Sequence, residues 1–232
     1  MKIEFFGHSI AGKNKSEKFD TFVDRIINKY STSGPDNIGI AKCSEERILY
    51  NLKKTKDIDI AIIFHSDPVF YFCPMFKSDN SKLSEKDFES GRMVFKTTVY
   101  TEYRNDKRID NNILETDRDT LSIEETKNVF KLYQEYFYTP ETNKNRHAGA
   151  LIQIDQYLSF KKIKAIHLLQ DKTHIPNWFN FTTGIVDFEL AAMQHDNNPY
   201  SCSYSRSANA ITEEGNDIIF NKLSEYIDKL KS

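Results

Sequence analysis

The sequence carries no excess of charge of either sign: 32 Lys and Arg residues stand against 34 Asp and Glu residues, for a formal net charge of −2. We therefore do not expect a nucleic-acid partner that binds through a broadly basic surface. A local basic patch is compatible with this net charge. No run of 18 apolar residues occurs, so no membrane span is predicted. The first ten residues turn polar after residue 6 and do not match a secretory signal.

Cysteine is scarce, and the motifs of common cofactor and metal sites are absent. Cys43, Cys73 and Cys202 form no CxxC pair, and three cysteines cannot all pair within one chain. A reducing, cytoplasmic setting is the simplest expectation. The sequence has no GxGxxG or GxxxxGK[ST] loop for a nucleotide and no HExxH or paired Cys/His spacing for a metal. We expect no cofactor and no metal.

The first 65 residues show a regular alternation of apolar patterns. Short apolar runs at 2–6, 37–41 and 58–64 predict strands. Apolar residues at helical spacing from 19 to 30 and after Ser44 predict the two helices between them, with Ser44 as an N-cap. A β-α-β-α-β order with short connections indicates a parallel sheet wound with helices.

The rest of the chain continues this pattern around one insertion. Residues 70–120 are rich in Asp, Lys, Asn and Ser, and we interpret them as an insertion or cap. Helical spacing returns at 122–138, 141–160 and 213–230, and a further strand is predicted at 163–169. We predict one α/β domain over the whole chain, a three-layer α/β/α sandwich with a central, mainly parallel sheet of the flavodoxin-like type.

Polar segments follow each of the first three predicted strands. GHSIAG begins at residue 7, AKCSEE at residue 41 and FHSDP at residue 64. Ligand sites of open α/β sheets lie beyond the carboxyl ends of the strands, where these three segments would meet. Each segment alone is also what a short turn uses for capping, so both interpretations stay open.

Four segments, FFGHSIAG, NIGIAKCSEERI, IAIIFHSDP and ANAITEEGNDIIFNKL, resemble in order the four sequence blocks of the SGNH (GDSL-type) serine hydrolases. The resemblance covers the start and the end of the chain and not the insertion. It implies a three-layer α/β/α fold. It also implies cleavage of an ester by a serine nucleophile, for example of an acyl or acetyl group on a lipid or a carbohydrate.

In the first two blocks the resemblance assigns roles to Ser9 and Lys42. Ser9 matches the nucleophile, with its own backbone N–H facing the oxyanion, and His8 replaces the family's Asp. A turn cap is the alternative role of Ser9. Lys42 stands where the family uses a glycine N–H as oxyanion donor, and it could instead bind an anionic substrate group or be solvated. Cys43 would be a nucleophile only with a histidine beside it.

The third block contains His65, Ser66 and Asp67. Ser66 takes the place of the family's oxyanion-binding Asn, and its hydroxyl can donate one hydrogen bond in the same way. Asp67 matches the family's Asp. His65 either reaches into the site or has a structural role.

The last block lacks the catalytic pair, because Ala210 stands where the family has its His and Ser207 where it has the Asp three residues earlier. Without an imidazole at position 210, no residue that matches the family pattern takes the proton from Ser9. The loss of this base lowers the rate of hydrolysis by several powers of ten. The chain is then a form in which a working His has been replaced, a natural pseudoenzyme, or an enzyme with another base. The good fit of the surrounding positions favours the first. His195 is the best substitute base and His174 the next.

The sequence therefore leaves three hypotheses about the function open. The first is an ester hydrolase that acts on a small-molecule, glycan or lipid ester. The second is a non-catalytic binding module for a carbohydrate or acyl ligand on the same fold, with residues 70–120 shaping the site. The third is an unrelated flavodoxin-like protein, and without a Gly-rich phosphate loop the sequence does not support nucleotide binding by it.

Overall fold

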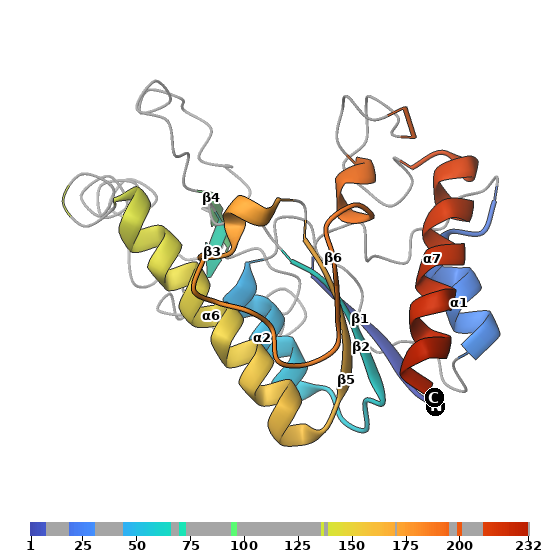
Figure 1. The fold of residues 1–232 in the computed structure, drawn as a ribbon, viewed down its shortest axis with the longest axis horizontal. Coiled ribbons are helices and arrows are strands. Elements are labelled where there is room, and N and C mark those ends of the chain that lie inside the picture. Colours follow the sequence, from blue (N-terminus) through green and yellow to red (C-terminus); the bar gives the residue numbers. More distant parts are fainter. Residues whose placement is uncertain are drawn as a thin grey trace, which may run out of the picture.

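Figure 1 shows the fold of the chain in the computed structural model. The structure describes residues 1–7, 19–30, 44–65, 70–72, 94–96, 136, 139–169, 171–194, 199–200 and 211–231. The strand predicted at 37–41 and almost all of the helix predicted at 122–138 lie outside these residues.

Four parallel strands form the central sheet, in the order β1-β2-β5-β6. They are β1 (Ile3–Gly7), β2 (Ile60–Phe64), β5 (Lys164–Leu168) and β6 (Ile185–Asp187). The register pairs Gly7 with Phe64 and Phe64 with Leu168, so the carboxyl ends of three strands meet at one edge. The predicted parallel α/β arrangement is confirmed. The sequence did not predict β6, because its three residues are too few to show the alternation of apolar and polar residues typical of a strand.

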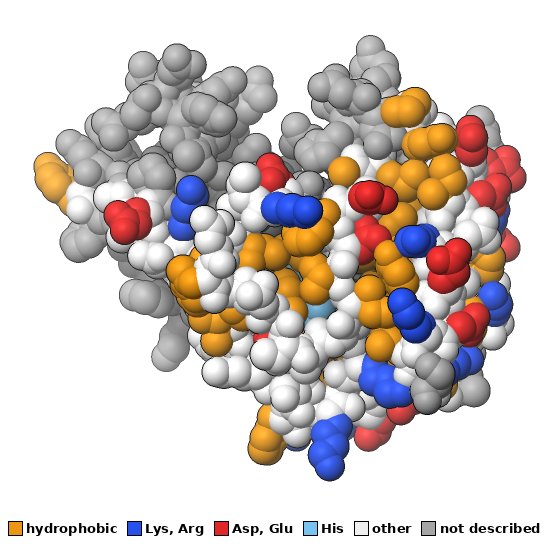
Figure 2. Space-filling view, viewed as in Figure 1, with side chains coloured by type: hydrophobic (Ala, Val, Ile, Leu, Met, Phe, Trp, Pro, Cys, Tyr) orange, Lys and Arg blue, Asp and Glu red, His pale blue; other side chains and the backbone are white. Residues whose placement is uncertain are grey.

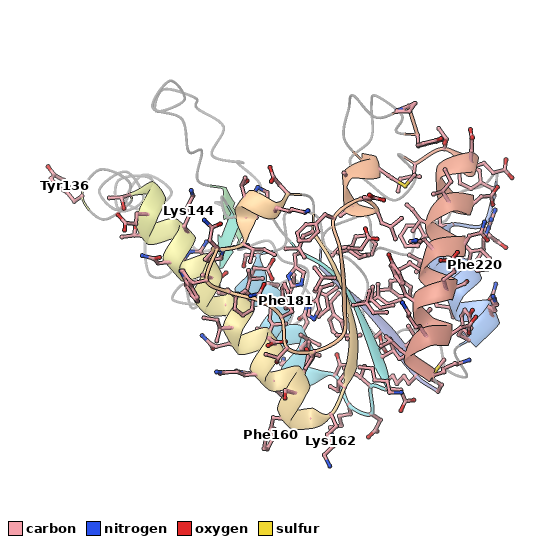
Figure 3. All side chains as sticks on the ribbon, viewed as in Figure 1. Tyr136, Lys144, Phe160, Lys162, Phe181 and Phe220 are labelled. Carbon is pink, nitrogen blue, oxygen red and sulfur yellow. The ribbon has the colours of Figure 1, made fainter. Side chains whose placement is uncertain are left out.

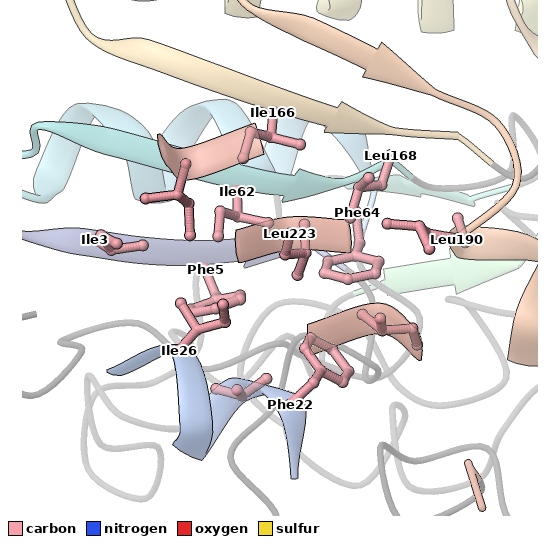
Figure 4. Packing of buried hydrophobic residues seen from close by; sticks show 14 of the residues in the cluster. Ile3, Phe5, Phe22, Ile26, Ile62, Phe64, Ile166, Leu168, Leu190 and Leu223 are labelled. Atoms are coloured by element: carbon pink, nitrogen blue, oxygen red, sulfur yellow. The ribbon is translucent and has the colours of Figure 1, made fainter. Parts of the chain in front are cut away.

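Helices cover both faces of this sheet (Figure 1). The helices α1 (Phe22–Tyr30) and α7 (Glu213–Lys231) pack on one face, and α2 (Glu45–Lys54) and α6 (Pro140–Lys161) pack on the other. Figure 4 shows the first face, where Phe5 and Phe64 meet Phe22 of α1 and Leu223 of α7. Since β1 and β2 are buried on both faces, β2 is a continuous apolar run in the sequence, and β1 is an apolar run interrupted by the buried Glu4.

The ends of α2 and α6 are set by local sequence. Ser44 caps α2 as predicted, and its side chain accepts a hydrogen bond from the backbone N–H of Arg47. Thr139 caps α6, forms a capping box with Thr142 and is followed by Pro140 in the first turn. The helix α6 ends at Lys161, and its C-cap, Lys162, adopts the left-handed conformation.

A second, two-stranded sheet lies within the predicted insertion. Its strands β3 (Phe70–Phe72) and β4 (Val94–Lys96) pair antiparallel. Two short 3-10 helices, η3 (Lys172–His174) and η4 (Ala191–Gln194), flank β6 in the chain. Among the helices that the structure describes, none is both long and apolar enough to cross a membrane.

Candidate functional site

Of the predicted site residues, His65 and the second substitute base, His174, fall within the described part of the chain, and His174 lies in η3. The others lie outside the described residues, so their predicted roles stay predictions: His8, Ser9, Lys42, Ser66, Asp67, His195, Ser207 and Ala210. The described residues next to them can still be placed, and they define the edge at which the candidate site is built.

Gly7 ends β1 directly before His8 and Ser9. Its φ is +110°, in the left-handed region that side-chain-bearing residues rarely adopt, and a Cβ atom here would collide with the carbonyl of Phe64. The sequence therefore needs glycine at this position, because a backbone with positive φ lies here directly against the carbonyl of the neighbouring strand.

The end of the last block, Thr212 to Asn216, holds two helices together. Asn216 is fully buried, and its Oδ1 accepts a hydrogen bond of 2.8 Å from the backbone N–H of Phe22, at the start of α1. Its Nδ2 donates to the carbonyls of Ile211 and Thr212. Gly215 packs so closely that a Cβ atom would lie 2.6 Å from Cγ2 of Ile211. These motif residues fix the start of α7 against α1.

His65 sits directly after β2 and is 2% exposed. Its Nδ1 lies 2.9 Å from Oε2 of Glu45, in the first turn of α2, and its Nε2 lies 2.9 Å from Nδ1 of His167, in β5. Glu45 and His167 are 1% and 0% exposed. Residues far apart in the sequence thus form one buried chain of hydrogen bonds across α2, β2 and β5.

The donor and acceptor roles in this chain depend on the tautomers of the two rings. With Glu45 ionised and both imidazoles neutral, His65 donates from Nδ1 to Glu45 and accepts at Nε2 from Nδ1–H of His167. The Nε2 atom of His167 then carries a lone pair and no hydrogen. It is buried and has no hydrogen-bond partner among the described residues.

His167 is held in its neutral form. Burial, and then the neighbouring ring of His65, keep the pKa of His167 well below its ordinary value. The carboxylate of Asp155 and the backbone of Thr183 act in the opposite direction but do not prevail.

Aromatic rings lie over the histidine pair. The ring of Phe181 stacks on His167 at a centroid distance of 4.0 Å and lies 5.3 Å from His65. Figure 3 shows Phe181 between α6 and the sheet. Figure 2 shows hydrophobic side chains gathered on this face of the molecule, with a histidine visible among them. The segment that carries Phe181 connects β5 to β6.

A third buried histidine, His147, projects from α6 and is 1% exposed. Burial is the main cause that lowers the pKa of His147 to about 4, and the negative charge of Glu45 offsets part of it. Neither ring nitrogen has a hydrogen-bond partner in the described part of the molecule. Beside it, Arg146 forms an ion pair with Glu46, and burial lowers the pKa of Arg146 to about 10.

Sequence reasoning identified His65 but missed Glu45, His147, His167 and Phe181. A signal existed for His167, which interrupts the apolar strand IKAIHLL at a position that alternation assigns to a covered face. His147 likewise stands on the inner face of a predicted helix. Nothing in the sequence indicates that these side chains meet, because their contacts are all long-range.

Within the residues that the structure describes, no group of three or more His, Cys, Asp or Glu side chains could hold a metal ion. No protein-family model matches the chain, and no curated protein matches it.

Proposed function

We propose that this protein is an SGNH-type serine hydrolase that acts on an ester, with its site at the carboxyl edge of the parallel sheet of a three-layer α/β/α sandwich. The observation that carries the proposal is that the described residues next to all four blocks converge on that edge. Gly7 precedes the first block's Ser9 and pairs with Phe64, and His65 donates its backbone N–H to Leu168.

The second and fourth blocks approach the same edge. Glu45, three residues after Lys42, contacts His65 through its side chain. Asn216, in the last block, accepts a hydrogen bond from the backbone N–H of Phe22, whose ring lies 5.8 Å from the ring of Phe64. These contacts of described residues support the proposal, and the positions of Ser9, Lys42 and Ala210 themselves stay predictions.

The proposed chemistry begins with attack of Ser9 Oγ on the acyl carbonyl, which gives an acyl-enzyme and releases the alcohol; water then hydrolyses the acyl-enzyme. The oxyanion receives hydrogen bonds from the backbone N–H of Ser9, from the segment at Lys42 and from the hydroxyl of Ser66. In an active form, a histidine at position 210 takes the proton from Ser9 and later returns it to the leaving group.

His65 is not the missing base. Both of its ring nitrogens are engaged, one by Glu45 and the other by His167, so it cannot accept the serine proton without breaking a buried hydrogen bond. This leaves position 210 as the place for the base, with His195 as the substitute within this chain.

A non-catalytic binding module on the same fold is the second candidate. The observation that favours it is the joint replacement of the catalytic pair by Ser207 and Ala210. A ligand would then be bound at the same edge and not cleaved.

Restoring the base tests the first proposal. We expect Ala210→His to hydrolyse p-nitrophenyl acetate roughly 10²–10⁴-fold faster than the present chain, since this is the usual contribution of general-base assistance. The rate should stay below that of a complete triad, because Ser207 does not orient the imidazole. The matched control is Ser9→Ala in the Ala210→His background, which should return the rate to background.

Equal rates in the single and the double variant would reject the hydrolase proposal and make Ser9 a turn residue. Hydrolysis by the unchanged chain that is lost in His195→Ala would show that the base lies at position 195.

A further inference from the structure

The amino edge of the sheet gathers the starts of the strands and the last turns of the helices. The parallel register sets the first residues of β1, β2 and β5 level with one another. Hydrogen bonds join the segments around them, since Nζ of Lys2 donates to the carbonyl of Lys56, and Nζ of Lys164 donates to the carbonyl of Leu230 near the end of α7. These segments therefore form one continuous surface, at the lower end of the molecule in Figure 1.

This surface, which we name the basic face, is rich in lysine. We define it as residues 2, 29, 53–59, 160–164 and 228–231, all of which the structure describes. It carries ten lysines and three aspartates, whereas the whole chain has a net charge of −2. The lysines are Lys2, Lys29, Lys53, Lys54, Lys56, Lys161, Lys162, Lys164, Lys229 and Lys231, and the aspartates are Asp57, Asp59 and Asp228. The basic face is thus opposite in charge to the molecule as a whole.

Part of this charge serves the fold. Lys2 pairs with the buried Glu4 at 3.4 Å, and Lys164 bonds the end of α7. Lysines in the last turn of a helix also interact favourably with the helix dipole. Four lysines of the basic face are exposed and form no ion pair within the described part of the chain: Lys53, Lys56, Lys161 and Lys162. Their charge is open to a partner.

An exposed aromatic ring stands within the basic face. Phe160, in the last turn of α6, is 79% exposed, and Nζ of Lys161 lies 5.5 Å from the centroid of its ring. Figure 3 shows Phe160 and Lys162 at this end of α6, with Lys144 toward the other end. A phenylalanine this exposed packs little against its own protein, and it leaves water only when a partner covers it.

We propose that the basic face binds the surface of a bilayer that contains anionic lipids. Anionic head groups attract the lysines, and an exposed phenylalanine enters the boundary between head groups and acyl chains. All ten basic residues of the face are lysine and none is arginine, the residue most suited to nucleic-acid recognition. A diffuse layer of negative charge therefore fits these point charges better than a nucleic acid does.

Screening permits this binding despite the net negative charge of the chain. At about 0.1 M salt the Debye length is about 10 Å, whereas strands of five residues, such as β1 and β2, are about 16 Å long. A bilayer against the basic face therefore interacts with its lysines and little with acidic groups at the carboxyl edge. The candidate site lies at that opposite edge, so the inference does not rest on the proposed hydrolase activity.

Co-sedimentation of the full chain with vesicles tests the proposal. We expect binding to vesicles of one part phosphatidylserine and two parts phosphatidylcholine, and much weaker binding to phosphatidylcholine alone. Raising the salt from about 0.1 M to about 1 M shortens the Debye length to about 3 Å and should release most of the protein. Equal binding to both kinds of vesicle, or binding to neither, would overturn the proposal.

Lys161→Gln/Lys162→Gln is the test variant, because it removes two charges beside Phe160 at exposed positions. Each lysine near an anionic surface contributes about fivefold to the partition constant, so we expect a loss of roughly 25-fold. The matched control is Lys144→Gln/Lys172→Gln, which removes the same charge from exposed lysines outside the basic face and should bind like the unchanged chain. Equal losses in both variants would assign the binding to net charge and reject the basic face as its site.

Phe160→Ala tests the apolar part of the contact. We expect about tenfold weaker binding, the lower end of what burial of a phenylalanine contributes, with the same dependence on salt as in the unchanged chain. An unchanged partition constant would contradict entry of the ring into the bilayer.

A short DNA duplex, followed by fluorescence anisotropy, tests the other class of polyanion. We expect no binding at the salt concentration at which the anionic vesicles bind. Duplex binding that Lys161→Gln/Lys162→Gln weakens, without binding to the vesicles, would assign the face to nucleic acid and overturn the proposal.

Discussion

Asn216 illustrates how much a single buried polar residue decides in this molecule. Its side chain makes three hydrogen bonds, to the backbone of Phe22, Ile211 and Thr212, and no part of it is exposed. A buried backbone N–H without an acceptor is costly, so the start of α1 depends on this amide. The residue resembles part of a catalytic block, yet in the structure it joins α1 to α7.

We expect Asn216→Ala to lower the free energy of unfolding by about 2–3 kcal/mol, since the N–H of Phe22 loses its buried acceptor. Urea denaturation followed by circular dichroism measures this. Asn221→Ala is the matched control, an exposed asparagine on the same helix, and should change stability by less than about 0.5 kcal/mol. Similar effects from both would show that Asn216 contributes no more than a surface residue.

At the scale of elements, the glycines mark where the backbone is constrained and where it is not. Gly7 ends β1 in the left-handed region against the carbonyl of Phe64, so its replacement is strained. Gly149 lies within α6, and a Cβ atom there would have no heavy atom within 4 Å. The two positions should therefore respond to alanine in opposite directions.

Gly149→Ala should stabilise the protein by about 0.5–1 kcal/mol, because alanine restricts the unfolded chain and favours the helix. For a chain of this size that is a rise in Tm of about 1–4 °C in a thermal melt. Gly7→Ala is the opposite case and should lower Tm in the same measurement. A fall in Tm for Gly149→Ala would mean that α6 is more tightly packed at this position than the structure indicates.

At the scale of the whole molecule, the buried neutral histidines make stability depend on pH. The pKa of His147 is about 4 in the folded protein, against about 6.5 in the unfolded chain, and that of His167 is also lowered. Between these values the unfolded chain binds more protons than the folded protein. The stability that these two histidines contribute by staying neutral is therefore fully present above about pH 6.5 and is lost as the pH falls below it.

From His147 alone, we expect the free energy of unfolding to be about 2–3 kcal/mol lower at pH 4.5 than at pH 7.5. Urea midpoints at the two pH values measure the difference. His147→Leu should reduce it, because the variant has no ring to protonate and also removes two nitrogens without hydrogen-bond partners in the described structure. An unchanged pH dependence in that variant would assign the effect to other groups.

The sequence by itself determined the local elements and their order. The apolar runs of β1, β2 and β5, the N-cap Ser44 and the helical spacing of α1, α2, α6 and α7 are local signals, and the structure confirms them. The parallel direction of the strands followed as well, because helices alternate with strands along the chain. The roles assigned to Ser9, Ser66 and Ala210 stay predictions, since these residues lie outside the described part of the chain.

Tertiary structure alone decided which polar groups meet. Glu45, His65 and His167 touch because the register of β2 and β5 brings the ends of the strands level and because the start of α2 lies against them. The two histidines are separated by 102 residues in the sequence, and no periodicity encodes such a contact. Burial then gave His167 its chemistry, because it holds the pKa of this imidazole well below the ordinary value.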